Sequence, residues 1–199
     1  QAAAEYIFVR INFHYAADFS TRSVFSLILE QFEALETLTK EESQRIEELH
    51  EALLSAGDDK LKVQRYFRLA VRKLLGRNQR RLIFLFDQFM DVYQEADGRL
   101  FANLRGLRED YKYRLSYLVF SRQSLQAMAL EENTREEFYE LLASNVVGLK
   151  PYGKQDAAEL LRRISSRNQT KLDEKLIEPL YNLTGGHGGL LRAAYIHAQ

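Results

Sequence analysis

The segment RLIFLFDQFM, residues 81–90, decides the fold of this chain. It contains five consecutive apolar residues, 82–86, bounded by the basic pair Arg80-Arg81 and by Asp87. An apolar run of this length predicts a strand buried on both faces, as in a parallel sheet covered by helices. Ligands of open α/β sheets bind outside the carboxyl ends of the strands, so Asp87 stands where a metal-bound phosphate would lie. The alternative is that Asp87 only caps the turn after the strand.

The segments around this strand alternate between strand and helix patterns. Further strands are expected at 5–13, at 115–120 and, as a short fourth strand, at 146–149 before Pro151. Helices are expected at 20–35, 39–54, 61–75, 100–109 and 134–143. This alternation predicts an α/β fold with a parallel sheet, right-handed crossovers and helices on both faces of the sheet.

Beyond Pro151 the strand patterns stop. Amphipathic helices are expected at 154–164, 173–183 and 190–198, with a glycine-rich turn at 184–189 between the last two. We therefore expect two domains. Residues 1–150 form an α/β core, and residues 151–199 form a small helical lid.

The composition narrows the range of functions. Lys plus Arg and Asp plus Glu number 28 each, which argues against a nucleic-acid partner. The basic cluster 77–81 follows a helix and is interpreted as a solvated surface. The absence of cysteine excludes disulfides and thiolate metal sites. With no apolar run of membrane-spanning length, the sequence predicts a cytoplasmic protein without a membrane partner.

Four local patterns occur in a recognisable order. Residues 83–88 are an apolar run ending in Asp-Gln, and residues 118–122 are a second apolar run ending in Ser-Arg. Residues 149–152, Leu-Lys-Pro-Tyr, precede the predicted helix at 154–164, and Gly185-Gly186-His187 comes near the end. In this order, nearly the whole chain resembles the part of a STAND-type AAA+ P-loop ATPase, of the NACHT/ORC-like branch, that follows the P-loop.

The resemblance assigns a role to each pattern. Residues 83–88 resemble the Walker B strand, and residues 118–122 resemble the sensor 1 strand. The later segments resemble the helical lid, whose Gly-Gly-His-Pro turn here has Gly188 in place of proline. The resemblance thus implies a P-loop NTPase-like parallel sheet followed by the lid, with ATP and Mg²⁺ as cofactors.

The same resemblance implies the site residues. Asp87 would hold Mg²⁺ through water, and Ser121 and Arg122 would contact nucleotide, with Arg122 at the γ-phosphate. His187 would report nucleotide to the lid as a sensor 2 equivalent. Gln88 replaces the glutamate that polarises the attacking water. Because a neutral amide orients water but cannot take its proton, the implied hydrolysis is slow.

The sequence contains no Gly-x-x-x-x-Gly-Lys-Ser/Thr, the loop that holds the phosphates in this family. In the family, that loop and the first strand precede the strand expected at 5–13. We expect a preceding segment of about 50 residues, the usual length of a βα unit with its upstream loop. Pairing with another chain, or a gap filled differently, are the alternatives. A weak ATPase activity is expected only if an upstream P-loop exists.

The sequence therefore leads to three hypotheses of function. The first is an ATP-binding switch in which nucleotide closes the lid and favours homo-oligomerisation, or signalling through attached effector domains. The second is a degenerate, non-hydrolysing scaffold for protein contacts. The third is an AAA+ DNA-handling regulator, which the neutral charge argues against.

Overall fold

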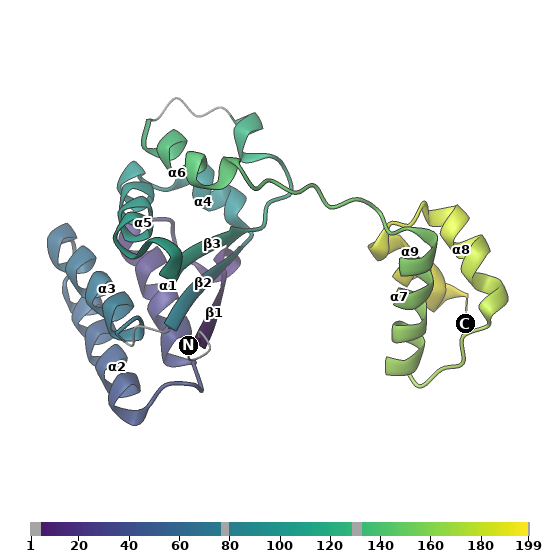
Figure 1. Cartoon of the computed structure of the whole chain (residues 1–199), viewed down its shortest axis with the longest axis horizontal. Coiled ribbons are helices and arrows are strands. Elements are labelled where there is room, and N and C mark those ends of the chain that lie inside the picture. Colours follow the sequence, from purple (N-terminus) through teal and green to yellow (C-terminus); the bar gives the residue numbers. More distant parts are fainter. Residues whose placement is uncertain (1–4, 77–79, 129–132, 199) are drawn as a thin grey trace. The chain divides into compact units, whose positions relative to one another are not determined.

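The computed structural model describes residues 5–76, 80–128 and 133–198. The chain divides into two compact units, Gln1–Asn145 and Val146–Gln199 (Figure 1). Each unit has a hydrophobic core of its own. None of the described helices combines the length and the apolar character that crossing a bilayer requires.

The first unit is built on a parallel sheet. Its strands are β1 (Glu5–Asn12), β2 (Arg80–Asp87) and β3 (Leu115–Val119), in the spatial order β1-β2-β3. All of these strands are parallel, and the register places Ile7 beside Leu82 and Leu82 beside Leu115. The first three predicted strands and the parallel α/β class are thereby confirmed.

Helices form both crossovers between the strands. The first crossover contains α1 (Thr21–Glu33), α2 (Lys40–Ser55) and α3 (Lys60–Leu74). The second contains α4 (Phe89–Glu95) and α5 (Gly98–Tyr111), and α6 (Asn133–Ala143) follows β3. Short 3₁₀ turns lie at Phe13–Tyr15, Lys112–Arg114 and Leu125–Met128. Helix α4 was not predicted, because its apolar stripe is only two turns long.

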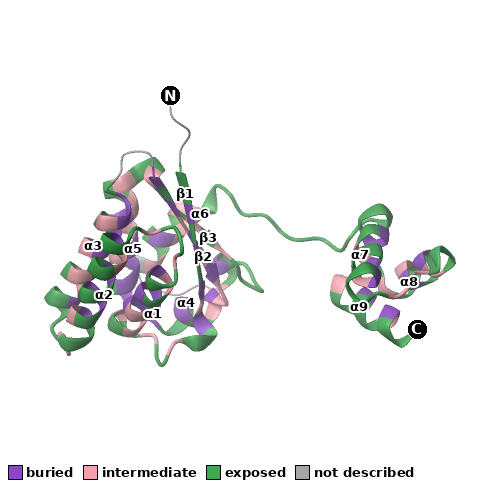
Figure 2. Ribbon diagram, turned by 90° about the horizontal axis from the view of Figure 1, so that it is seen from below, coloured by how far each residue is buried: buried purple, intermediate pink, exposed green. Residues whose placement is uncertain are grey.

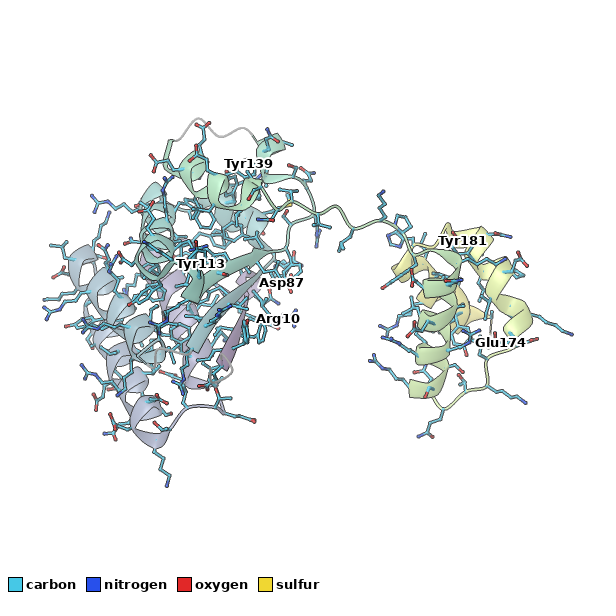
Figure 3. The ribbon with its side chains drawn as sticks, in the orientation of Figure 1. Arg10, Asp87, Tyr113, Tyr139, Glu174 and Tyr181 are labelled. Atoms are coloured by element: carbon cyan, nitrogen blue, oxygen red, sulfur yellow. The ribbon has the colours of Figure 1, made fainter. Side chains whose placement is uncertain are left out.

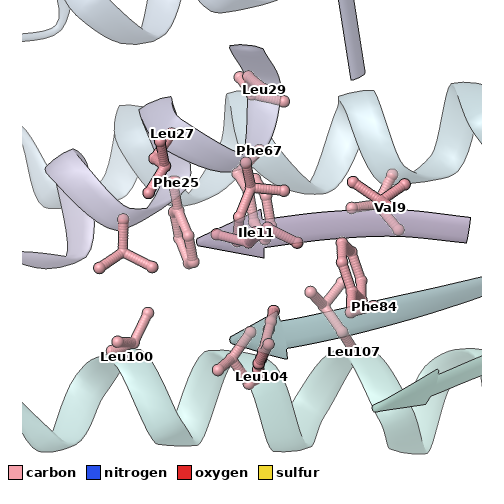
Figure 4. Packing of buried hydrophobic residues seen from close by; sticks show 14 of the residues in the cluster. Val9, Ile11, Phe25, Leu27, Leu29, Phe67, Phe84, Leu100, Leu104 and Leu107 are labelled. Atoms are coloured by element: carbon pink, nitrogen blue, oxygen red, sulfur yellow. The ribbon is translucent and has the colours of Figure 1, made fainter. Parts of the chain in front are cut away.

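One face of the sheet is covered by these helices. Side chains alternate along each strand, and the buried set includes Val9, Ile11 and Phe84. On this face α1 packs against β1 and α5 packs against β3. Figure 4 shows the buried residues between these helices. Strands in sequential order joined by right-handed crossovers place both crossovers on the same face, which explains the one-sided covering.

The opposite face is open among the described residues. Tyr6, Phe8, Leu118 and Phe120 lie on it, and each is between 45% and 57% exposed. Figure 2 shows that the helices α1, α2, α3 and α5 lie to one side of the strands. The expectation of helices on both faces is thus met on one face only. The reason is topological: among the described residues the crossovers lead from β1 to β2 and from β2 to β3, so both run across the sheet in the same direction.

The expected fourth strand at 146–149 is wrong. These residues have no regular structure, and Val146, Val147 and Leu149 are between 62% and 92% exposed. A strand forms only with a hydrogen-bonding neighbour. None of the described strands pairs with this segment. The first unit ends at Asn145, whereas the sequence placed the domain boundary at residue 150.

The second unit consists of α7 (Lys154–Arg167), α8 (Ile177–Thr184) and α9 (Gly188–His197), with a 3₁₀ turn at Glu174–Leu176. The three helices predicted here are confirmed. Their core contains Leu161, Leu180, Leu191 and Tyr195. The unit's action as a lid stays a prediction.

A buried cation joins three elements of the first unit. The guanidinium of Arg80, at the start of β2, is 1% exposed and donates to Glu42 at 2.9 Å and to Glu5 at 3.0 Å. Burial raises the pKa of Glu42, but hydrogen bonds from the Thr39 N–H and from Arg80 lower it further, to below its ordinary value. The interpretation of 77–81 as a solvated surface is therefore wrong for Arg80, whose charge is compensated inside the unit.

Two substitutions on opposite faces of β1 test whether helices cover only one face of the sheet. Ile11→Ala should lower the free energy of unfolding by about 2 to 5 kcal/mol, because Ile11 is fully buried under the helices. Phe8→Ala should lower it by less than about 1 kcal/mol, because Phe8 lies on the open face. Urea unfolding of both variants measures the difference. Equal losses would show that the second face is covered.

The Arg80 cluster predicts a pH-dependent stability. Glu42→Gln should cost about 3 kcal/mol near neutral pH, since it leaves part of a buried charge uncompensated. The pKa of Glu42 is lower in the folded than in the unfolded state, so its contribution is present above pH 4.5 and is lost as the pH falls through the folded pKa. The difference between wild type and variant should therefore shrink in acid, as measured by urea unfolding. Glu41→Gln is the control, because Glu41 is 86% exposed, and it should change stability little.

Candidate functional site

A pocket of about 240 Å³ lies at the carboxyl ends of β2 and β3. The two strands are parallel and adjacent, so the residues that follow them meet at one edge of the sheet. The pocket is lined by His14, Asp87, Gln88, Met90, Asp91, Phe120, Ser121 and Arg122. Four of the five residues predicted from sequence, Asp87, Gln88, Ser121 and Arg122, are thus brought together.

Asp87 is the last residue of β2, and its carboxylate faces the open side of the sheet. An Nη2 atom of Arg10 lies 2.6 Å from its Oδ2 atom (Figure 3). The Arg10 side chain is 68% exposed and that of Asp87 is 25% exposed. An ion pair this open to water contributes little to stability and is readily exchanged. The carboxylate can therefore change partner without a large cost.

Arg10 was not among the residues predicted from the sequence. On β1 it is paired in register with Leu85, two residues before Asp87 on β2. Residues two apart on a strand point to the same face, so Arg10 is the diagonal neighbour of Asp87. Only the strand register reveals this pair, since the two residues are 77 positions apart in the chain.

Gln88 has a left-handed backbone, with φ 58° and ψ 41°. The cause lies in the residues around it. Phe89 is fully buried, and its ring packs against Phe86 of β2, so the chain must reverse at once after Asp87. A residue other than glycine in this conformation costs about 1 to 2 kcal/mol. Such strain is found at functional sites, where the surrounding structure imposes it.

The residues after β3 complete the pocket. The Phe120 N–H donates to the Phe86 carbonyl at 2.8 Å, which fixes the start of this segment beside β2. The Ser121 hydroxyl donates to the Gln123 carbonyl at 2.6 Å, so its oxygen is oriented within the turn. Arg122 is exposed, and within the described ranges no carboxylate lies at ion-pair distance from it. Its guanidinium is therefore available to an anion.

His14 is a second residue that the sequence did not single out. It follows the carboxyl end of β1, and its backbone N–H donates to Asn12 Oδ1 at 3.1 Å. Its exposed imidazole lines the same pocket. The available signal was its position after a strand, which places it at the same edge as Asp87 and Ser121.

His187 belongs to the second unit. Its Nδ1 atom accepts a hydrogen bond from the Leu190 N–H at 3.3 Å, so the ring caps the first turn of α9. Gly188 is next to it, and a Cβ atom there would lie 2.8 Å from Cε2 of Tyr152. A side chain at 188 would therefore require the Tyr152 ring to shift. The nucleotide contact expected for His187 stays a prediction.

A partial P-loop pattern also lies in the second unit. Residues 148–154 read Gly-x-x-x-x-Gly-Lys, but Gln155 follows where the motif has Ser or Thr. No strand leads directly into the run, since residues 144–153 contain none, and Lys154 Nζ lies 2.5 Å from Glu178. With its lysine paired and its hydroxyl missing, this run does not form a phosphate cradle.

The oxygen donors of the pocket suit a metal ion that is held mainly by phosphate and water. Across residues 5–76, 80–128 and 133–198 there is no group of three or more His, Cys, Asp or Glu side chains that could hold a metal. The pocket does contain two carboxylates, Asp87 and Asp91. Mg²⁺ is commonly held by one or two carboxylates together with substrate phosphates and water. The pocket therefore fits a magnesium ion that arrives with a phosphate ligand.

The strain at Gln88 gives a prediction. Gln88→Val should lower the free energy of unfolding by about 1 to 2 kcal/mol, because a β-branched residue is poorly tolerated at positive φ. Gln88→Gly should not lower it, because glycine adopts this conformation without steric cost. Thermal unfolding of the two variants provides the comparison. A Gln88→Gly variant less stable than Gln88→Val would contradict the left-handed geometry.

Comparison of the chain with protein-family models, with curated proteins and with solved structures finds no match. The chemistry of the pocket is therefore inferred from its own residues at one edge of a parallel sheet. They are the Asp87 carboxylate paired with the exposed Arg10, Gln88 with its strained backbone, and the available guanidinium of Arg122.

Proposed function

We propose that the pocket at the ends of β2 and β3 binds the phosphates of ATP together with Mg²⁺, and that the chain is the nucleotide-dependent part of a switch. The observation that carries the proposal is the convergence of Asp87, Gln88, Ser121 and Arg122 in one pocket. They come from two strand ends that α4 and α5 separate in the sequence.

The chemistry of three of these residues supports a specific role. Asp87 accepts hydrogen bonds from water bound to the metal ion, and Arg122 offers a fork of N–H donors to phosphate oxygens. Gln88 can orient a water molecule but cannot remove its proton. The proposal therefore includes slow hydrolysis and a long-lived bound state, which suits a switch better than a motor.

The size of the pocket limits which part of the nucleotide it holds. A volume of about 240 Å³ is below the range of pockets that enclose a drug-sized ligand. The residues named here account for the phosphate end of ATP and its metal ion. Contacts to the base and ribose, and the backbone N–H groups that cradle the phosphates in P-loop proteins, come from outside this pocket.

A thermal-shift experiment tests the proposal. Mg-ATP at 100 times its dissociation constant should stabilise the protein by about 2.7 kcal/mol, which raises the melting temperature by several degrees. ATP with a chelator should give a smaller shift. Asp87→Asn should abolish the Mg-dependent part of the shift, and Arg122→Ala should reduce the shift with or without metal.

The control is Asp58→Asn, which removes an exposed carboxylate that lines a different pocket. This variant should keep the full response to Mg-ATP. Each variant is compared by its ligand-induced shift, because Asp87→Asn also breaks the pair with Arg10. A wild-type protein that ignores Mg-ATP, or an Asp87→Asn variant with an unchanged response, would refute the nucleotide site.

A protein-interaction scaffold is the second candidate function. The observation that favours it is the open sheet face, with Tyr6 and Phe8 exposed on β1 and with Leu118 and Phe120 exposed on and just after β3, on the other side of β2. The thermal-shift experiment separates the two functions, since a scaffold without a nucleotide site gives no shift with Mg-ATP.

A further inference from the structure

A hydrogen-bonded row of Ser, His and Glu lies between α1 and α2, outside the pocket described above. The Ser26 hydroxyl oxygen is 2.8 Å from His50 Nε2, and His50 Nδ1 is 2.7 Å from Glu33 Oε1. Ser26 and Glu33 belong to α1, and the largely buried His50 belongs to α2. Both distances are those of well-formed hydrogen bonds.

The helical repeat explains how the row forms. Ser26 and Glu33 are seven residues apart, which is two turns, so they lie on the same side of α1. His50 follows Leu49 and Ile46, whose side chains anchor α2 in the core. Helix packing therefore holds the imidazole between the two side chains of α1, and rotation of any one of them would break a hydrogen bond.

With Glu33 ionised and the His50 ring neutral, the donors and acceptors of the row determine the tautomer of His50. An ionised Glu33 carboxylate can only accept, so Nδ1 of His50 carries the proton of that hydrogen bond. In the neutral ring, Nε2 is then an acceptor, and the Ser26 hydroxyl must donate to it. This is the tautomer that a general base needs beside a serine nucleophile.

Ser26 also faces a cavity. It lines a pocket of about 300 Å³ together with Tyr15, Ala16, Ala17, Arg22, Ser23, Leu27, Glu30 and Leu54. Ser26 is half-buried, so its oxygen is reachable from the pocket while His50 is on its protected side. The apolar part of the lining, formed by Tyr15, Ala16, Ala17, Leu27 and Leu54, suits a short acyl group.

A serine nucleophile also needs a donor for the developing negative charge. The backbone N–H of Ser26 is inside α1 and bonds within the helix, so it cannot serve. Arg22 lies one turn earlier on the same side of α1 and lines the same pocket. One of its nitrogens donates to the Leu54 carbonyl at 2.9 Å, and its remaining N–H groups can face an oxyanion.

We propose that Ser26, His50 and Glu33 form an esterase centre for short carboxylic esters. Ser26 Oγ forms a bond to the acyl carbon as its proton passes to His50 Nε2. The bond from the acyl carbon to the alcohol oxygen breaks, and that oxygen takes the electron pair and the proton from His50. Water then adds to the acyl-serine, giving its proton through His50 to Ser26 and releasing the carboxylic acid. Because one side-chain donor replaces a backbone oxyanion hole, turnover is slow.

Covalent labelling of the whole protein tests the proposal directly. A fluorophosphonate probe should attach one group per chain, and mass spectrometry should find it in the tryptic peptide 23–40. This peptide holds both Ser23 and Ser26, so fragmentation must place the label on Ser26. Ser26→Ala should remove the label. Ser116→Ala is the control, because Ser116 is an exposed serine of β3 that lines neither of the two pockets, and this variant should keep the label.

Hydrolysis of p-nitrophenyl acetate tests the role of the base. His50→Gln should lower the rate about 100-fold or more, as loss of a general base does. Glu33→Gln should also lower the rate, because an amide no longer selects the required tautomer of His50. Circular dichroism checks that the variants fold. If a variant does not fold, the position of the label on the wild-type protein decides.

Three outcomes would overturn the proposal. They are an unlabelled wild-type protein, a label on a residue other than Ser26, and a hydrolysis rate that Ser26→Ala leaves unchanged. Any of them would leave the row as a structural link between α1 and α2. Asp87→Asn should keep the label, so this test is independent of the nucleotide site.

Discussion

Right-handed crossovers in a sheet of sequential strand order are the constraint on which the first unit depends. Because β1, β2 and β3 follow one another in space as they do in the chain, both crossovers cover the same face. The rule packs α1, α3 and α5 on the buried side, and among the described residues it leaves Tyr6 and Phe8 exposed on the opposite side. It also brings the carboxyl ends of all the strands to one edge, where Asp87 and Arg122 line the same pocket.

The helices and strands with a strong hydrophobic period were predictable from the sequence. Which segments pair with them or cover them was not. The apolar run 82–86 indicated a strand covered on both faces, yet Ile83 and Leu85 are only half-buried on the open side. Nothing in a run of apolar residues records whether a helix lies above it. In the same way, residues 146–149 have the composition of a strand but no neighbour to pair with. Whether a strand has a hydrogen-bonding neighbour, and whether a helix covers its face, depends on other segments of the chain.

The candidate site shows the same division. Asp87, Gln88, Ser121 and Arg122 were predictable because each follows an apolar run, and parallel strands end at one edge. The contact of Arg10 with Asp87 could be found only from the register of β1 against β2. The backbone strain at Gln88 could be found only from the position of the buried Phe89. The row of Ser26, His50 and Glu33 depended on how two helices pack. Such contacts between distant residues leave no local pattern in the sequence.

The buried guanidinium of Arg80 has a consequence for the kinetics of folding. Its partners Glu42 and Glu5 are 38 and 75 positions away in the chain, so the cluster is complete only after two long loops have closed. Local helical turns form far faster than such loops order. Interactions that are completed late stabilise the native state more than the transition state, so they slow unfolding rather than speed folding. We therefore expect Arg80 to slow the unfolding of the first unit more than it speeds its folding.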